Sequence, residues 1–261
     1  MDTRSRMLAR TAIACALAAV VVPASAATCT AQSGATLVPL VELYTSEGCS
    51  SCPPADRWLS TTFGGGEARR AAVLAFHVDY WNDLGWKDRF SSATYTDRQH
   101  QVAAANRLSF VYTPQVVVQG RSVRDWQDDA GAIDALRKEP AAATIALAAT
   151  RTGDTVAIDA HAAVAAAARR PGARLFIALT SDGLESAVKA GENRGVRLHH
   201  DAVVRTLSDG AAVDANGDAV LATRLALPPD GSMPKLVAFV QVPARGDVLQ
   251  SLVLPLDACV R

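Results

Sequence analysis

The sequence has 261 residues, 49% of them hydrophobic and 20% charged, and its 26 acidic and 26 basic side chains give a formal net charge of zero. This composition is that of an ordinary globular protein, and the length allows one large or two modest domains. Because the charges balance, nothing in the composition favours nucleic acid or an acidic membrane as a partner.

The first 26 residues have the pattern of a secretory signal. Arg4, Arg6 and Arg10 form a basic start, an apolar stretch follows, and an Ala-x-Ala ending predicts cleavage after Ala26. The apolar run is shorter than the roughly 20 residues of a membrane-spanning helix, so we expect no membrane anchor in the mature form. We therefore expect a periplasmic or secreted protein.

Loss of the signal leaves four cysteines, an even number that indicates pairing in an oxidising compartment. The natural partition joins Cys49 to Cys52 and Cys29 to Cys259. The second pair is predicted to be a structural disulfide that clamps the two ends of the mature chain. In the chain-entropy model, closing so long a loop stabilises the fold by up to about 5 kcal/mol. The alternative is a pair of free terminal thiols.

Residues 37–140 alternate apolar strand-like runs with helical patterns. We expect strands over 37–45, 71–81, 114–120 and 121–126, and helices over 54–63, 88–108 and 129–139. Strands that alternate with helices imply parallel pairing in an α/β layer, and the last two strands, which meet at Gly120, add an antiparallel edge.

The pattern changes after Pro140. Strand-like runs follow one another, separated by turn signals such as Asn216-Gly217, a strong hairpin sequence. We therefore predict an antiparallel β-sandwich-like domain over residues 141–259.

Cys49 and Cys52 lie between the first strand and the first helix of the α/β segment. Pro53 and Pro54 lack N–H donors and fit only in the first turn of a helix, so this helix begins beside the two cysteines. There the unpaired N–H groups and the helix dipole favour an anion and lower the pKa of a thiol. We predict a catalytic pair in which Cys49 attacks a partner's disulfide and Cys52 resolves the mixed disulfide that forms.

Thr113-Pro114 stands directly ahead of a buried strand, a place where a cis bond is one solution for the backbone. A strand–CxxC–helix unit facing a cis-proline loop is the arrangement of the thioredoxin fold. The predicted fold class is therefore an α/β thioredoxin-like domain over 37–140, followed by the β-sandwich-like domain.

Four motifs resemble an exported bacterial thioredoxin-like family of unknown function: "ELYTSEGCSSCPPAD", "FHVDYWNDLGWKDRF", "YTPQVVVQG" and "GENRGVRLHHDAVVR". The resemblance spans nearly the whole chain after the signal. It implies a thioredoxin-like fold with a β-rich C-terminal extension and no established substrate. In thioredoxin-like proteins the residue before the cis-proline contacts the partner, which by resemblance is Thr113 beside Pro114. The dipeptide Ser50-Ser51 leaves the direction of electron flow open.

Other side chains are candidates for roles around the dithiol. Trp81 and Trp86 follow a strand end and would form an apolar rim for substrate. Glu47 could move the proton, although it would oppose thiolate formation if it lay close to the sulfur. Asp79 could accept the proton of Cys52; the alternative is a solvated carboxylate at the edge of a loop.

Three functions are consistent with these residues. The first is a thiol-disulfide oxidoreductase that needs no cofactor and acts on protein or small-molecule disulfides and thiols. The second is a copper or zinc carrier in which Cys49, Cys52 and one histidine bind the metal. The histidine is His199 or His200 and not both, since adjacent strand residues face opposite ways. The third is a binding module with a static disulfide.

Overall fold

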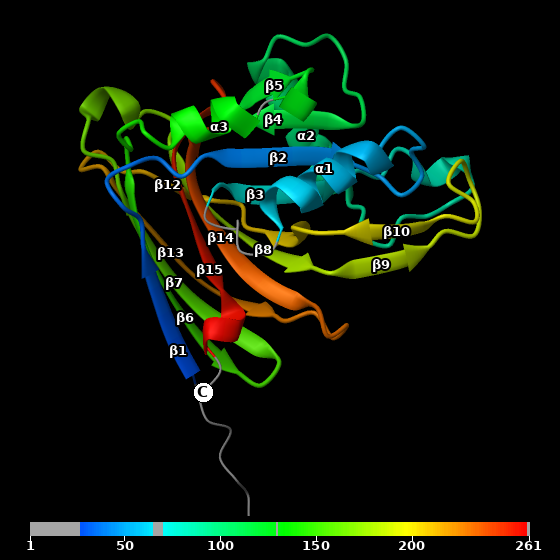
Figure 1. Ribbon diagram of the computed structural model, residues 1–261. Coiled ribbons are helices and arrows are strands. Elements are labelled where there is room, and N and C mark those ends of the chain that lie inside the picture. The colour runs from blue at the N-terminus through cyan, green and yellow to red at the C-terminus, as the bar shows by residue number, and fades with distance from the viewer. Residues whose placement is uncertain (1–26, 65–69, 129, 260–261) are drawn as a thin grey trace, which may run out of the picture.

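The structure is a computed structural model that describes residues 27–64, 70–128 and 130–259. The predicted signal segment, 1–26, lies outside the described residues. Within them the chain is mostly β-sheet with three α-helices (Figure 1). No helix in this part of the chain is long and apolar enough to cross a membrane.

The three helices lie where the sequence predicts helices. They are α1 (Pro53–Phe63), α2 (Ala93–Ala105) and α3 (Ala130–Leu136). The first begins at its two prolines, because a residue without an N–H loses no helical hydrogen bond there. The second begins after Ser92, whose hydroxyl accepts a hydrogen bond from the amide of Thr94. Short 3₁₀ segments are η2 (Asn82–Leu84), η3 (Trp126–Asp128), η4 (Ala167–Arg169) and η5 (Leu256–Cys259).

The larger sheet joins nine strands of the described chain in the order β15-β14-β8-β11-β3-β2-β4-β5, with β12 paired to β8. Its strands are β2 (Leu40–Thr45), β3 (Ala72–His77), β4 (Gln115–Val118), β5 (Arg121–Val123), β8 (Arg174–Asp182), β11 (Val203–Leu207), β12 (Ala211–Ala212), β14 (Met233–Val242) and β15 (Asp247–Pro255). The pairs β2–β3 and β3–β11 are parallel, and the other pairs are antiparallel. Every residue of β2 and β3 is buried, as expected for parallel strands covered on both faces.

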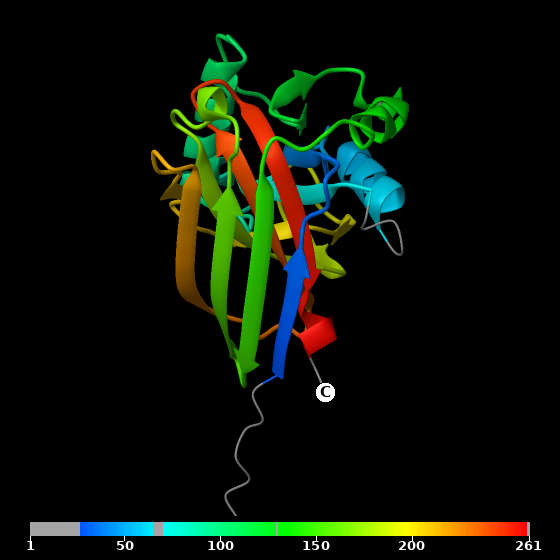
Figure 2. The same ribbon diagram turned by 90° about the vertical axis from the view of Figure 1, so that its left-hand side faces the viewer.

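A second, antiparallel sheet has the order β1-β6-β7-β13 and faces the viewer in Figure 2. Its strands are β1 (Ala27–Gln32), β6 (Thr144–Thr152), β7 (Thr155–Ala163) and β13 (Asp218–Ala226). Alternate residues of β6 and β7 are buried, and they pack on apolar residues of β8, β14 and β15. The remaining two strands, β9 (Leu184–Ala187) and β10 (Arg197–His200), pair with each other and form an arm beside α1 (Figure 1).

The larger sheet crosses the boundary expected near residue 140. Strand β11, from the second segment, pairs in parallel with β3 of the first at Val203 and Ala75. The segments 37–140 and 141–259 therefore share one sheet, so the second segment contributes directly to the surroundings of the first.

Cys29 of β1 and Cys259 of η5 form the disulfide that the sequence predicts, with their Cα atoms 5.0 Å apart and 230 positions between them in the sequence. The bond fastens β1 to the end of the described chain, beside the core that the two sheets share.

A buried ion pair of the first segment is hydrogen-bonded to the second segment. Arg98 of α2 donates to both carboxylate oxygens of Glu42 in β2, at 2.9 and 3.0 Å, and to the side-chain oxygen of Gln241 in β14, at 3.0 Å. Tyr44 donates a further hydrogen bond to Glu42. The side chains of Arg98 and Glu42 are 7% and 0% exposed, so each charge depends on the other for its compensation.

We expect Arg98→Met to lower the free energy of unfolding by about 3–5 kcal/mol, because it leaves Glu42 buried without a counter-charge. Urea unfolding measures the change. Arg121→Ala is the matched control, since its pair with Asp247 also joins the two segments but is 58% exposed at the arginine and should contribute under about 1 kcal/mol. Equal losses in the two variants would contradict the role given to Arg98.

Candidate functional site

Cys49 and Cys52 form a disulfide at the start of α1, with their Cα atoms 5.5 Å apart. Cys52 is the N-cap residue, and its carbonyl accepts hydrogen bonds from the amides of Ala55 and Asp56. Both cysteines have no exposed surface, whereas Ser50 and Ser51 between them are exposed. The pair therefore lies just beneath the surface, at the positive end of a helix dipole.

The loop that contains Thr113 lies against the disulfide. The Thr113–Pro114 bond is cis. Ser51 Oγ is 3.3 Å from Cys49 Sγ and donates to the Thr113 carbonyl at 3.4 Å. Trp81 Nε1 donates to Thr113 Oγ1 at 2.8 Å. The structure thus brings Thr113 and Trp81, two residues that the sequence assigns to substrate binding, next to the cysteine loop.

Trp86 and Glu47 pair with each other. Trp86 Nε1 donates to Glu47 Oε2 at 2.7 Å, and the amide of Glu47 donates to Asp88 Oδ2 at 2.9 Å. Burial by itself raises the pKa of Glu47, but the interactions with His200, Ser186 and Trp86 together outweigh it and the pKa is lowered. A carboxylate held in this way stays ionised, so it acts as a fixed charge more readily than as a proton carrier.

Asp79, the other residue expected to move a proton, is hydrogen-bonded to Thr96 in the first turn of α2. Thr96 Oγ1 donates to Asp79 Oδ1 at 2.6 Å and accepts from the amide of Asp79 at 3.2 Å. Among the described residues these hydrogen bonds connect Asp79 to α2 and not to the cysteine loop.

The two adjacent histidines face opposite sides of β10, as the strand period requires. His199 is exposed, 3.1 Å from Asp201 Oδ2. His200 is buried, with Nε2 3.5 Å from Glu47 Oε1 and its ring centroid 4.9 Å from that of His77. Over residues 27–64, 70–128 and 130–259, no three side chains of His, Cys, Asp or Glu are arranged to hold a metal ion.

A buried ion pair supports this region. His77 Nδ1 is 2.6 Å from Asp88 Oδ2, and both side chains have no exposed surface. Burial lowers the pKa of His77, but the charge and hydrogen bond of Asp88, together with the charges of Asp56 and Glu47, outweigh burial and raise it. Burial raises the pKa of Asp88, but the charge and hydrogen bond of His77, together with two backbone amides, outweigh burial and lower it. Sequence reasoning assigned no role to Asp88.

Asp56 lies one helical turn after Cys52 on α1, and residues four apart share a helix face. Its carboxylate is buried and accepts a hydrogen bond from Thr45 Oγ1 at 3.2 Å. Burial raises the pKa of Asp56, although the neighbouring charges of His200 and His77 reduce the shift. A carboxyl group with a raised pKa holds a proton more readily than a free one, so Asp56 is a candidate to take up a proton from Cys52.

The second segment contributes two residues that sequence reasoning did not assign. Asn193 Nδ2 donates to the carbonyls of Glu47 and Cys49, both at 2.9 Å, and Asn193 is 5% exposed. Glu192 Oε2 accepts from the amide of Ser50 at 3.0 Å. Both belong to "GENRG", the start of the fourth motif that resembles the exported family, and this resemblance was the sequence signal that could have pointed to them.

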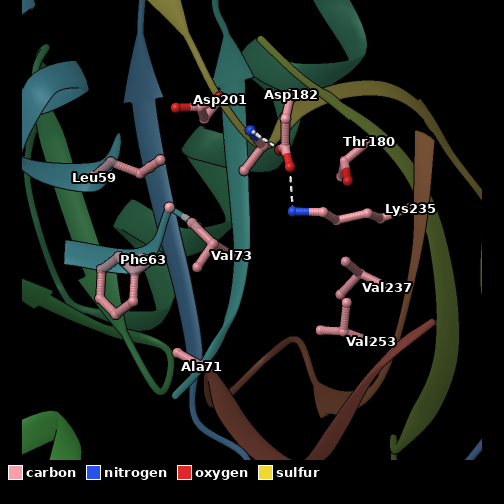
Figure 3. Close-up of a pocket in the computed structure, with 12 residues that line it drawn as sticks. Leu59, Phe63, Ala71, Val73, Thr180, Asp182, Asp201, Lys235, Val237 and Val253 are labelled. Atoms are coloured by element: carbon pink, nitrogen blue, oxygen red, sulfur yellow. Dashed lines mark hydrogen bonds and ion pairs between the residues drawn. The ribbon is translucent and has the colours of Figure 1, made fainter. Parts of the chain in front are cut away.

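Two hollows lie near this helix. Figure 3 shows the first, a cavity of about 30 Å³ between α1 and the sheet, beside the ion pair of Asp182 and Lys235. It has room for one or two water molecules, not for a substrate. The second is a surface groove of about 200 Å³ whose lining includes Pro114, exposed Phe110 and buried Trp126.

Residues 40–241 match the family described as Protein of unknown function (DUF1223), and the chain belongs to this family. No curated protein matches the chain. The crystal structure of protein AGR_C_4864 from Agrobacterium tumefaciens is 25% identical, with a TM-score of 0.59 over 85% of this chain and 96% of that one. HBP35 of Porphyromonas gingivalis is 16% identical, with a TM-score of 0.58 over 86% of this chain and 76% of that one, which shows likeness of fold alone.

The His77–Asp88 pair predicts how stability depends on pH. The lowered pKa of Asp88 gives stabilisation that is present above about pH 4 and is lost on acidification. The raised pKa of His77 gives stabilisation that is present below about pH 6.5 and is lost as the pH rises through the raised value. The stability difference between wild type and His77→Gln should therefore be largest between about pH 4 and 6.5.

Urea unfolding at a series of pH values measures this difference. His161→Gln is the control, because His161 pairs with Asp218 at the surface and should change stability little at any pH. A His77→Gln difference that stays constant from acid to alkaline pH would show that the pair is not charged.

Proposed function

We propose that this member of the DUF1223 family is a thiol-disulfide exchange protein with a thioredoxin-like first segment, in which Cys49 and Cys52 are the reacting pair. The observation that carries the proposal is the joint position of the pair at the start of α1 and against the Thr113–Pro114 loop. The helix start favours a thiolate, and the loop offers Thr113 and Trp81 as contacts for a partner.

The exchange proceeds in two steps from the reduced protein. The Cys49 thiolate attacks one sulfur of a partner disulfide, forms a mixed disulfide and releases the other partner sulfur as a thiolate. Cys52 then loses its proton, and its thiolate attacks the Cys49 sulfur. The Cys49–Cys52 bond forms, the second partner thiolate leaves, and the partner has gained two electrons. The reverse sequence oxidises a partner dithiol, and the surroundings of the pair do not select a direction.

We assign to Asp56 the role of accepting the proton that Cys52 loses in the resolving step. Asp56 is one turn away on the same helix, buried, and has a raised pKa because of that burial. Of the two candidates from the sequence, Glu47 has a lowered pKa, and the hydrogen bonds of Asp79 connect it to Thr96 of α2. Asp56→Asn should therefore slow the resolving step and alter its dependence on pH, whereas an unchanged pH profile would remove Asp56 from the scheme.

The partner's chain would lie in the groove that Pro114 helps to line. The groove is lined by aromatic and apolar side chains and by one arginine: Phe110, Tyr112, Pro114, Val123, Arg124 and Trp126. A protein or peptide disulfide with an apolar flank fits this lining better than a highly charged small molecule does. We place the reaction in the periplasm or outside the cell, because both disulfides of the described chain are stable in oxidising surroundings.

The test is a single-turnover reaction of the reduced protein with oxidised glutathione, quenched in acid and read by mass spectrometry. Wild type should form the Cys49–Cys52 disulfide. Cys52→Ser should accumulate a mixed disulfide on Cys49, because no second thiolate resolves it. Cys49→Ser should react at least about 100-fold more slowly, since the thiolate at the attacking position is lost.

The double variant Cys29→Ser/Cys259→Ser is the control, because it removes the other disulfide and should leave the exchange unchanged. If reduced wild type forms neither species, the Cys49–Cys52 bond is a static bridge. If Cys52→Ser accumulates no adduct while Cys49→Ser does, the assignment of the attacking cysteine is wrong.

A further inference from the structure

Neither sulfur of the pair is reachable in the described conformation. Cys49 and Cys52 are 0% exposed. Disulfide exchange requires the incoming sulfur to contact the sulfur that it attacks. Some neighbouring segment must therefore move before any thiol can react.

The tip of the β9–β10 arm, residues 188–196, is fastened to the cysteine loop by three hydrogen bonds. Two run from Asn193 to the carbonyls of Glu47 and Cys49, and one runs from the amide of Ser50 to Glu192. The tip also packs closely on Trp86, because a Cβ added to Gly191 would lie 3.2 Å from the Cβ of Trp86. In Figure 1 the tip of the arm reaches the same end of the molecule as the loop between β2 and α1.

Of the segments next to the dithiol, the arm is the one whose displacement costs the least free energy. Its two strands pair with each other and with no other strand of the described chain. An isolated two-stranded ribbon is marginally stable. Its base is anchored by buried Leu184, Leu198 and His200, whereas seven of the nine residues from 188 to 196 are not buried. Few buried contacts hold the tip, which is the property of segments that open locally.

We propose that this tip is a cover over the dithiol, and that Asn193 and Glu192 are specificity-determining residues which admit a thiol to Cys49 only when the tip is lifted. The biological meaning of the cover rests on the exchange function proposed above. The cover itself is a property of the fold, and it makes the rate of exchange depend on how readily a partner displaces the tip. Free small thiols then react slowly, and a protein partner that contacts residues 188–196 reacts faster.

The experiment measures how fast a trialkylphosphine reduces the Cys49–Cys52 bond of the oxidised full chain. The phosphine attacks one sulfur, the bond breaks to two thiols, and water supplies the oxygen of the phosphine oxide. Acid quenching, alkylation and peptide mass spectrometry distinguish this pair from Cys29–Cys259. Because the reductant is synthetic, the result does not depend on any biological partner.

Asn193→Ala should be reduced about ten-fold faster than wild type, because the two hydrogen bonds that close the tip are lost. Asn193→Asp, which keeps the shape but places oxygen against the two carbonyls, should be faster still. Glu192→Ala, a change at an exposed side chain that leaves folding intact, should give a smaller increase of about two- to five-fold.

Arg197→Ala is the matched control, because it breaks the exposed pair with Glu185 on the same arm without touching the cysteine loop, and its rate should equal that of wild type. Folded Asn193→Ala and Glu192→Ala variants reduced at the wild-type rate, or more slowly, would overturn the cover. If they are faster but neither they nor wild type exchanges with glutathione, the cover stands and the exchange function fails.

Discussion

The burial of charge around the cysteine loop constrains the whole structure. A carboxylate taken out of water is stable only with a counter-charge or hydrogen-bond donors, and a loop carbonyl in the interior needs a donor as well. Glu47 Oε2 meets this requirement with Trp86, and His200 Nε2 lies 3.5 Å from the other oxygen of the carboxylate. The carbonyls of Glu47 and Cys49 meet it with Asn193. Two of these three partners come from β10 and the turn before it, about 150 residues further along the chain.

The second segment supplies these partners because it joins the sheet of the first. Strand β11 pairs with β3, which brings the β9–β10 arm next to α1. The same arrangement places Gln241 within reach of Arg98 on the other side of the sheet. The α/β segment thus lacks some of the partners of its own buried polar groups, and the β-rich segment supplies them. In the proposed exchange reaction, that dependence makes the second segment part of the reactive site.

Local patterns in the sequence predicted the elements that local physics controls. Pro53 and Pro54 fixed the start of α1, and the buried apolar runs at 37–45 and 71–81 contain β2 and β3. The pairing of Cys29 with Cys259 followed from counting cysteines in an oxidising compartment. Long-range contacts were beyond such reasoning, because the parallel pairing of β11 with β3 leaves no periodic signature. His200 therefore entered only as a candidate metal ligand, and the hydrogen bonds of Asn193 were missed. Asp79 was predicted to accept a proton because it lies near the end of a strand, but its carboxylate accepts a hydrogen bond from the hydroxyl of Thr96.

The central claim, that Cys49 and Cys52 exchange electrons with partners, is tested most directly by their equilibrium reduction potential. The purified protein would be equilibrated in a series of glutathione redox buffers, and the oxidised fraction of this pair read by mass spectrometry after alkylation. Proteins that exchange disulfides have potentials between about −120 and −270 mV, and the account predicts a value in that range. A pair that stays oxidised down to about −300 mV would behave as a structural bridge and would contradict the account.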